Sequence, residues 1–234
     1  MHQNLTAPFN TPERSTALDA LRGLAMLWMT VYHFCFDLNS FGHIQQDFYN
    51  DPVWTWQRTC ILSLFLFCVG WSQSNVRQFS WKRWLQIAAC ALLVTAGSYL
   101  MYPKSFIYFG VLHGICLMLL LLWIFRPLGQ WLYGLAGICL MLFLYPPWTN
   151  NAVPWNVLGL ISQKPITEDY VPILPWFAVV CVGYAFGQTS IKKGWRFHVH
   201  PWLKPLSSLG QYSLLYYMLH QPVLIGLLYL GRLA

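Results

Sequence analysis

The chain alternates between long apolar runs and short breaks that are polar or contain proline. A membrane-spanning helix needs about 20 mostly apolar residues, and seven runs approach this length. Proline-containing breaks, such as Pro146-Pro147, separate several of them. The pattern predicts an all-α, polytopic integral membrane bundle of about seven transmembrane helices. The expected helices are 16–38, 53–75, 84–101, 106–125, 130–145, 172–188 and 208–230, with a longer loop at 148–171.

Composition supports this interpretation. The chain is 57% hydrophobic and only 9% charged, whereas soluble domains are roughly a quarter charged. Seven spans leave no room in 234 residues for a separate soluble domain. We therefore expect one transmembrane domain over residues 1–234, with residues 1–15 as a cytoplasmic segment. The run from Ala17 bears charges and lacks a signal-peptide pattern, so we expect the first helix to be retained.

The basic residues predict an orientation. In the seven-helix arrangement, ten of the 14 lysines and arginines fall on the side of the N-terminus, which the positive-inside rule assigns to the cytoplasm. This predicts a membrane protein with its N-terminus cytoplasmic and its C-terminus outside. Topology also explains the net charge of +7, and no nucleic-acid partner is expected. The ten are Arg14, Arg22, Arg77, Lys82, Arg83, Arg126, Lys192, Lys193, Arg196 and Lys204.

The first helix contains polar residues on one face. At 100° per residue, Asp19, Arg22, Thr30, His33 and Asp37 lie on a stripe about 80° wide. Charges within a span are costly and usually pair or function, so this stripe should face the bundle interior or a water-filled cleft. Asp37 follows His33 by one turn and can orient its imidazole as a general base. The alternative is a buried ion pair that fixes helix packing. For Asp19 and Arg22, which lie near the cytoplasmic end of the helix, the alternative is an interfacial ion pair.

Other polar groups occur at related depths. His113 lies near the outer end of the fourth helix and Asp169 in the outer loop, so both are expected to converge with His33 and Asp37. His220 falls near mid-membrane on the last helix. Packing roles, or haem ligation by His33 and His113, are alternatives. No metal is expected, because a metal site needs a tighter cluster. No nucleotide-binding or G-x-S-x-G motif occurs.

The same residues resemble a known family. The run RSTALDALRGLAMLWM, followed by HFCFDL from His33, resembles the first helix of bacterial membrane proteins related to heparan-alpha-glucosaminide N-acetyltransferase, within a wider group of transmembrane acyltransferases. LFLFCVGWS, FGVLHGI, DYVPILPWF and SLGQYSLLYYMLHQPVL extend the resemblance over nearly the whole chain. His33 stands where the lysosomal enzyme has an asparagine, and His43 is nearest to its essential histidine. The heparan substrate is therefore not carried over.

The resemblance implies acyl transfer, with acyl-CoA (acetyl-CoA) as co-substrate and a hydroxyl or amine of a glycan-type acceptor as second substrate. In this interpretation His33, oriented by Asp37, is the base and His113 assists. Arg22, Arg77, Lys82 and Arg83 are expected to hold CoA phosphates, and for the last three topology alone is the alternative. The resemblance also implies a plasma (bacterial inner) membrane location. The alternatives are a proton-coupled small-molecule transporter and a non-catalytic membrane scaffold, and a homo-oligomer is possible. The expected substrate-binding residues are Asp19, Arg22, Asp169, Tyr170, Trp176 and His220.

Overall fold

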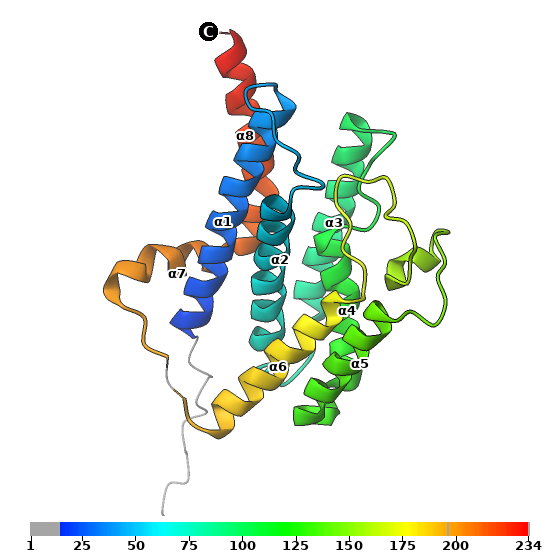
Figure 1. The fold of residues 1–234 in the computed structure, drawn as a ribbon. Coiled ribbons are helices and arrows are strands. Elements are labelled where there is room, and N and C mark those ends of the chain that lie inside the picture. The colour runs from blue at the N-terminus through cyan, green and yellow to red at the C-terminus, as the bar shows by residue number, and fades with distance from the viewer. Residues whose placement is uncertain (1–14, 196, 234) are drawn as a thin grey trace, which may run out of the picture.

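A computed structural model describes residues 15–195 and 197–233 of the chain (Figure 1). Apart from one isolated bridge, all regular structure in these residues is helical, so the predicted all-α class is confirmed. Short 3₁₀ turns cover Arg126–Trp131, Trp155–Leu158 and Pro201–Leu203. The α-helices are α1 (Thr16–Ser40), α2 (Pro52–Gln73), α3 (Trp81–Met101), α4 (Val111–Phe125), α5 (Leu132–Leu144), α6 (Trp176–Lys192), α7 (Lys204–Gln211) and α8 (Ser213–Leu233).

Polar caps fix where the first three helices begin. The side chains of Ser15, Asp51 and Ser80 accept hydrogen bonds from backbone N–H groups in the first turns of α1, α2 and α3. Such caps satisfy N–H groups that have no partner within the helix. Pro52 follows directly at the first position of α2, where its missing N–H costs nothing. These local signals explain why the first three predicted helices match the structure closely.

The C-terminal part differs from the prediction of one helix at 208–230. The chain turns at Tyr212, so that α7 lies across the lower part of α1 and α8 runs beside α1 (Figure 1). Trp202 is 85% exposed just before α7, and Lys204 is exposed at its start. A short amphipathic helix with exposed Trp and Lys is typical of the membrane interface. The sequence pattern alone did not show the turn, because Tyr212 is neither a proline nor a glycine and is compatible with a continuous helix.

Two other helices begin later than predicted. The fourth was expected from residue 106 but begins at Val111, because the preceding segment forms a loop held to α3. There, Ser98 accepts from the backbone N–H of Ile107, and Thr95 donates to the carbonyl of the same residue. The sixth was expected from residue 172 and begins at Trp176. For the fourth helix, the hydrogen bonds of Thr95 and Ser98 with the Ile107 backbone take the place of the first predicted turn.

α4 and α5 are separate helices, as the two apolar runs predicted, and both pack against α6. The chain reverses at Gly129, whose φ of +56° is a left-handed conformation that glycine adopts easily. Arg126, at the end of α4, donates to the carbonyl of Val76 in the α2–α3 connection. After α5, Asn156 donates to the hydroxyl of Tyr108, which precedes α4. α5 therefore returns to the side of the molecule on which α4 began (Figure 1).

The apolar helices form an integral membrane bundle. Among the described residues, four helical stretches are long and apolar enough to span a membrane: Pro52–Gln73, Trp81–Met101, Val111–Leu144 and Ser213–Gly231. The third of these contains both α4 and α5. Large apolar side chains point outward from the bundle, as lipid contact requires; Leu100 of α3, for example, is 83% exposed. The count of seven spans stays a prediction, since α1 and α6 do not qualify by these criteria.

Close helix crossings build the core. α6 packs against α2 and α5, and an ideal Cβ on Gly183 would lie 2.2 Å from the carbonyl oxygen of Phe67. Small residues permit such close approach of helices in membranes. α1 packs against α2 and also contacts α7 and α8. This second contact determines where the polar stripe of α1 points.

Candidate functional site

The polar stripe of α1 faces α7 and α8, which confirms that it points away from lipid. We call this contact the polar seam, with an inner half against α7 and an outer half against α8. Its pairs are Thr16 with Ser207, Arg22 with Asp19 and Gly210, Thr30 with Tyr216, His33 with His220, and Asp37 with Gln221.

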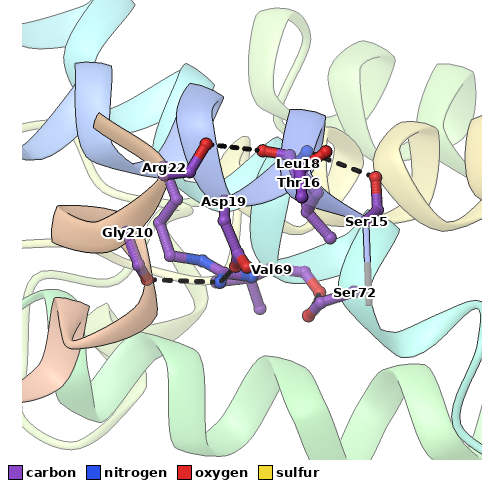
Figure 2. A network of polar contacts seen from close by, with 9 residues as sticks. Ser15, Thr16, Leu18, Asp19, Arg22, Val69, Ser72 and Gly210 are labelled. Carbon is purple, nitrogen blue, oxygen red and sulfur yellow. Dashed lines mark hydrogen bonds and ion pairs between the residues drawn. The ribbon is translucent and has the colours of Figure 1, made fainter. Parts of the chain in front are cut away.

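The inner half contains a buried ion pair. Arg22 Nη1 lies 3.0 Å from Asp19 Oδ1 and also donates to the carbonyl of Gly210 at 3.5 Å. Figure 2 shows the guanidinium reaching both groups, with Val69 close by. Asp19 is only 2% exposed and Arg22 9%. The expected ion pair is present, but it is buried and not interfacial, and its arginine also contacts α7. The substrate-binding role of both residues stays a prediction.

Two glycines allow α1 and α7 to cross at this point. A Cβ on Gly23 would lie 1.9 Å from the carbonyl oxygen of Leu206, and a Cβ on Gly210 1.9 Å from that of Asp19. Because both obstacles are backbone atoms, no rotation of a side chain would relieve them. Ser207 adds a hydrogen bond to the carbonyl of Thr16 at 3.0 Å. The inner half is a tightly packed joint with little free space.

The outer half begins with a hydroxyl chain. Thr30 donates to the carbonyl of Met26 at 2.8 Å, so the Tyr216 hydroxyl, 2.6 Å away, donates to Thr30. One turn farther along α8, the His220 ring lies 5.2 Å from that of His33 between centroids, at an angle of 56°. These contacts place two histidines from different helices side by side.

The expected pairing of His33 with Asp37 is replaced by another. Gln221 Nε2 donates to both carboxylate oxygens of Asp37, at 2.9 and 3.1 Å, and no hydrogen bond joins Asp37 to His33 among the described residues. His33 instead packs against Tyr32 and His220 and keeps part of its surface accessible. Asp37 therefore orients Gln221, so the predicted carboxylate–imidazole pair is not formed.

His220 has a defined tautomer. Its Nδ1 lies 2.7 Å from the carbonyl oxygen of Tyr217, an acceptor, so Nδ1 bears the proton. The ring lies nearly parallel to that of Tyr216, at 9°. Its Nε2 is buried and has no hydrogen-bond partner within the described part of the chain. A lone pair is therefore available on Nε2 at the centre of the outer half.

His113 and Asp169 lie together at the start of α4 and not in the polar seam. His113 Nδ1 accepts from the N–H of Gly110 at 3.3 Å, so Nε2 bears the proton and contacts the Thr95 hydroxyl at 3.1 Å. Asp169 Oδ2 accepts from the N–H of Val111 at 2.7 Å. Burial raises the pKa of Asp169, while this hydrogen bond and the charges of neighbouring cations oppose the shift. Both side chains thus cap α4, and their predicted roles in catalysis and binding stay untested.

Tyr170 lies in the loop between α5 and α6, and Trp176 is the first residue of α6. The Tyr170 hydroxyl donates to the carbonyl of Asn156, and burial raises its pKa above the ordinary value. Trp176 is half-buried at the start of α6 and packs against the main core. The structure gives both residues packing contacts, and their binding roles stay predictions.

The C-terminal ends of α1, α3 and α8 bring charged groups together. Burial, followed by the negative charges of Glu168 and Asp37, raises the pKa of Tyr102, so these carboxylates lie near the end of α3. Burial and the charge of Arg58 lower the pKa of Lys164. The Lys164 ammonium also lies 5.9 Å from the ring centroid of Tyr49, within cation–π range. His43 is exposed in the α1–α2 connection, outside the polar seam.

Residues 216, 217 and 221 were not singled out from the sequence. Yet Tyr216, Tyr217, His220 and Gln221 occupy positions i, i+1, i+4 and i+5 of one helix, so they share a face. This spacing is the signal that could have found them.

Haem ligation by His33 and His113 does not fit this arrangement, because both nitrogens of His113 are engaged. Across residues 15–195 and 197–233, no group of three or more His, Cys, Asp or Glu side chains is placed to hold a metal ion.

Comparison with known proteins gives one finding. The family model described as heparan-alpha-glucosaminide N-acetyltransferase, catalytic, matches residues 14–222. This range includes the whole polar seam. No curated protein and no solved structure matches the chain.

Proposed function

Because this chain belongs to the family of the heparan-alpha-glucosaminide N-acetyltransferase catalytic domain, a family of membrane acetyltransferases, we propose that it transfers an acetyl group from acetyl-CoA to a hydroxyl or amine of a glycan-type acceptor. The observation that carries the proposal is the histidine pair in the outer half of the polar seam. His33 and His220 are in ring contact, and Nε2 of His220 is buried without a hydrogen-bond partner among the described residues. General-base catalysis of acyl transfer needs such a nitrogen.

Acetyl transfer from a thioester requires little beyond positioning and proton transfer. A base removes the proton from the acceptor hydroxyl or amine, whose oxygen or nitrogen attacks the thioester carbonyl carbon. CoA then leaves with its sulfur and recovers a proton. The imidazoles of the outer half can move the proton without a metal ion or a redox group. The transporter alternative has no comparable support, since the family match favours acetyl transfer.

The donor is assigned to the side of the molecule where α1 begins. Arg77 in the α2–α3 connection, and Lys82 and Arg83 at the start of α3, are exposed there. Their charges suit the phosphates of CoA. Arg22 is left out of this assignment, because its guanidinium is buried and engaged by Asp19.

We place this side in the cytoplasm of a bacterium and the bundle in the inner membrane. The described residues on this side include seven further lysines and arginines besides the buried Arg22, whereas the opposite connections contain few. Cytoplasmic connections of membrane proteins are enriched in lysine and arginine. Acetyl-CoA would also be available on this side. The seven are Arg77, Lys82, Arg83, Arg126, Lys192, Lys193 and Lys204.

Purified protein in detergent, incubated with radiolabelled acetyl-CoA, tests the proposal. Glucosamine serves as the amine acceptor and glucose as the hydroxyl acceptor, and CoA release is followed in parallel with a thiol reagent. We expect CoA release that depends on the protein, together with labelled acceptor. Absence of both acetyl-CoA binding and CoA release would contradict the proposal. Proton-driven uptake into proteoliposomes without CoA release would favour a transporter instead.

A further inference from the structure

We propose that His220, through Nε2, is the general base of acetyl transfer, and that His33 lies beside the acceptor without serving as the base. This inference rests on the proposed function. It replaces the expectation that His33, oriented by Asp37, takes the proton.

The first argument is the tautomer. The Tyr217 carbonyl oxygen, 2.7 Å from Nδ1, can only accept, so the neutral His220 ring must place its proton on Nδ1 and a lone pair on Nε2. A general base needs this state: a fixed ring whose free nitrogen points away from its own support. His33 has no hydrogen bond of this kind among the described residues, so nothing fixes its tautomer.

The second argument is that Nε2 is unpartnered. Buried polar atoms are nearly always hydrogen-bonded, because a buried polar atom without a partner destabilises the fold. Three buried side-chain atoms lack a partner among the described residues, and two of them, Nε2 of His220 and Oε1 of Gln221, belong to adjacent residues of α8. An acceptor hydroxyl or amine at this position would donate to Nε2 of His220. His113, by contrast, uses both ring nitrogens for its own helix and loop.

The third argument is that an acceptor can reach Nε2 of His220. His220 is 9% exposed, but His33, whose ring is in contact with it, and Tyr217, one turn before it, keep accessible surface. The titratable groups around Nε2 are His33 from α1 and Tyr216 and Tyr217 from α8. The Asp169 carboxylate, from the loop before α6, interacts electrostatically with Tyr217. An acceptor would therefore approach between His33 and Tyr217.

The step balances without another reactant. Nε2 takes the proton from the acceptor O–H or N–H as the new bond to the acetyl carbonyl carbon forms. The C–S bond then breaks, and its electron pair leaves on the CoA sulfur. Nε2–H returns the proton to this thiolate, which restores the neutral ring and yields the acetylated acceptor and free CoA.

The test is His220→Asn in the full-length protein. The Asn amide can occupy the position of Nδ1 and donate to the Tyr217 carbonyl, so the variant keeps the structural hydrogen bond and loses only Nε2. We expect kcat to fall by about 10²–10⁴-fold, as is typical of general-base loss, with a small change in KM. The rise of kcat with pH on the acid side should disappear, and the melting temperature should stay near that of the wild type.

The matched control is His200→Asn, at an exposed histidine before α7, whose Oδ1 can still accept from the Trp202 N–H and which should retain kcat within a few-fold. If the wild type releases no CoA, the proposed function itself fails. If the wild type is active and His220→Asn keeps its kcat and pH profile, only the assignment of the base fails. Label retained on wild-type protein without acceptor would mean an acetyl-histidine intermediate, which would also overturn the role of base.

Discussion

The two halves of the polar seam use similar residues in opposite ways. In the inner half, Asp19 and Arg22 are buried against each other and two glycines bring the backbones into contact. In the outer half, His220 and Gln221 each leave a buried atom without a partner among the described residues. One stripe on one helix therefore serves two purposes. Where polar groups are all satisfied they hold helices together, and where atoms stay open they are available to a ligand.

Removing the cation of the inner half should give the largest effect on stability. Arg22→Met removes the cation that lies 3.0 Å from the buried Asp19 carboxylate, and breaking a buried pair in this way costs about 3–5 kcal/mol. We expect a marked drop in melting temperature, measured on purified protein in detergent. The double variant Asp19→Asn with Arg22→Met removes both charges and should recover much of the loss. Wild-type stability of Arg22→Met alone would show that the pair is not structural.

The glycine contact is the next way to break the inner half. Gly210→Ala places a Cβ 1.9 Å from the Asp19 carbonyl oxygen, so α7 must shift away from α1. Overpacking of this kind typically costs about 1–3 kcal/mol. The control is Gly226→Ala in α8, where the added Cβ meets open space and helix propensity favours alanine by up to about 1 kcal/mol. Equal melting temperatures for the two variants would contradict the account.

Two variants of the Asp37–Gln221 pair test whether Gln221 stabilises the Asp37 carboxylate in the outer half. Gln221→Leu removes both donors to the Asp37 carboxylate, and an unsatisfied buried acceptor costs about 1–3 kcal/mol. Asp37→Asn should cost less, because the Gln221 amide can rotate so that its unpartnered Oε1 accepts from the new amide. Thermal unfolding of both variants checks this order. The reverse order would mean that Gln221 does not support Asp37.

The smallest expected effect is the contribution of Asp169 to the pH dependence of stability. Burial raises the pKa of this carboxyl, so the folded state keeps the proton after the unfolded chain has lost it. The contribution to stability is thus present at low pH and is lost as pH rises from about 4, the ordinary Asp pKa, through the raised pKa. Asp169→Asn, which can still accept from Val111, lacks this dependence. Its melting temperature relative to the wild type should rise across that window, and a constant difference would contradict the assignment.

Much of the fold was predictable from the sequence because lipid imposes a simple rule. Apolar runs of spanning length, bounded by Ser80 or Pro146, match the observed helices to within a few residues. The break at Tyr212 was missed, because interfacial α7 and spanning α8 are joined by a residue that interrupts neither pattern. Likewise, the late start of α4 depends on hydrogen bonds from Thr95 and Ser98 that no periodicity reveals.

Only the part of the site that lies on α1 was predictable from the sequence. The helical period of α1 was enough to place His33 and Asp37 on a face turned away from lipid. It could not identify the partner helix, because residues 33 and 220 meet through tertiary packing. Spacing of four residues also suggested a His33–Asp37 bond, but Gln221 from α8 offers the carboxylate two donors at once. A local pair was displaced by a better long-range partner.

The most direct test of the account compares stability and turnover in two variants side by side. Melting temperature and kcat for acetyl transfer from acetyl-CoA are measured for Arg22→Met and His220→Asn in the same detergent. The account predicts that Arg22→Met loses stability while its folded fraction keeps kcat within a few-fold. It predicts that His220→Asn keeps its melting temperature and loses kcat by at least about 10²-fold. The opposite pattern, with catalysis lost in the inner half and only stability lost in the outer half, would contradict it.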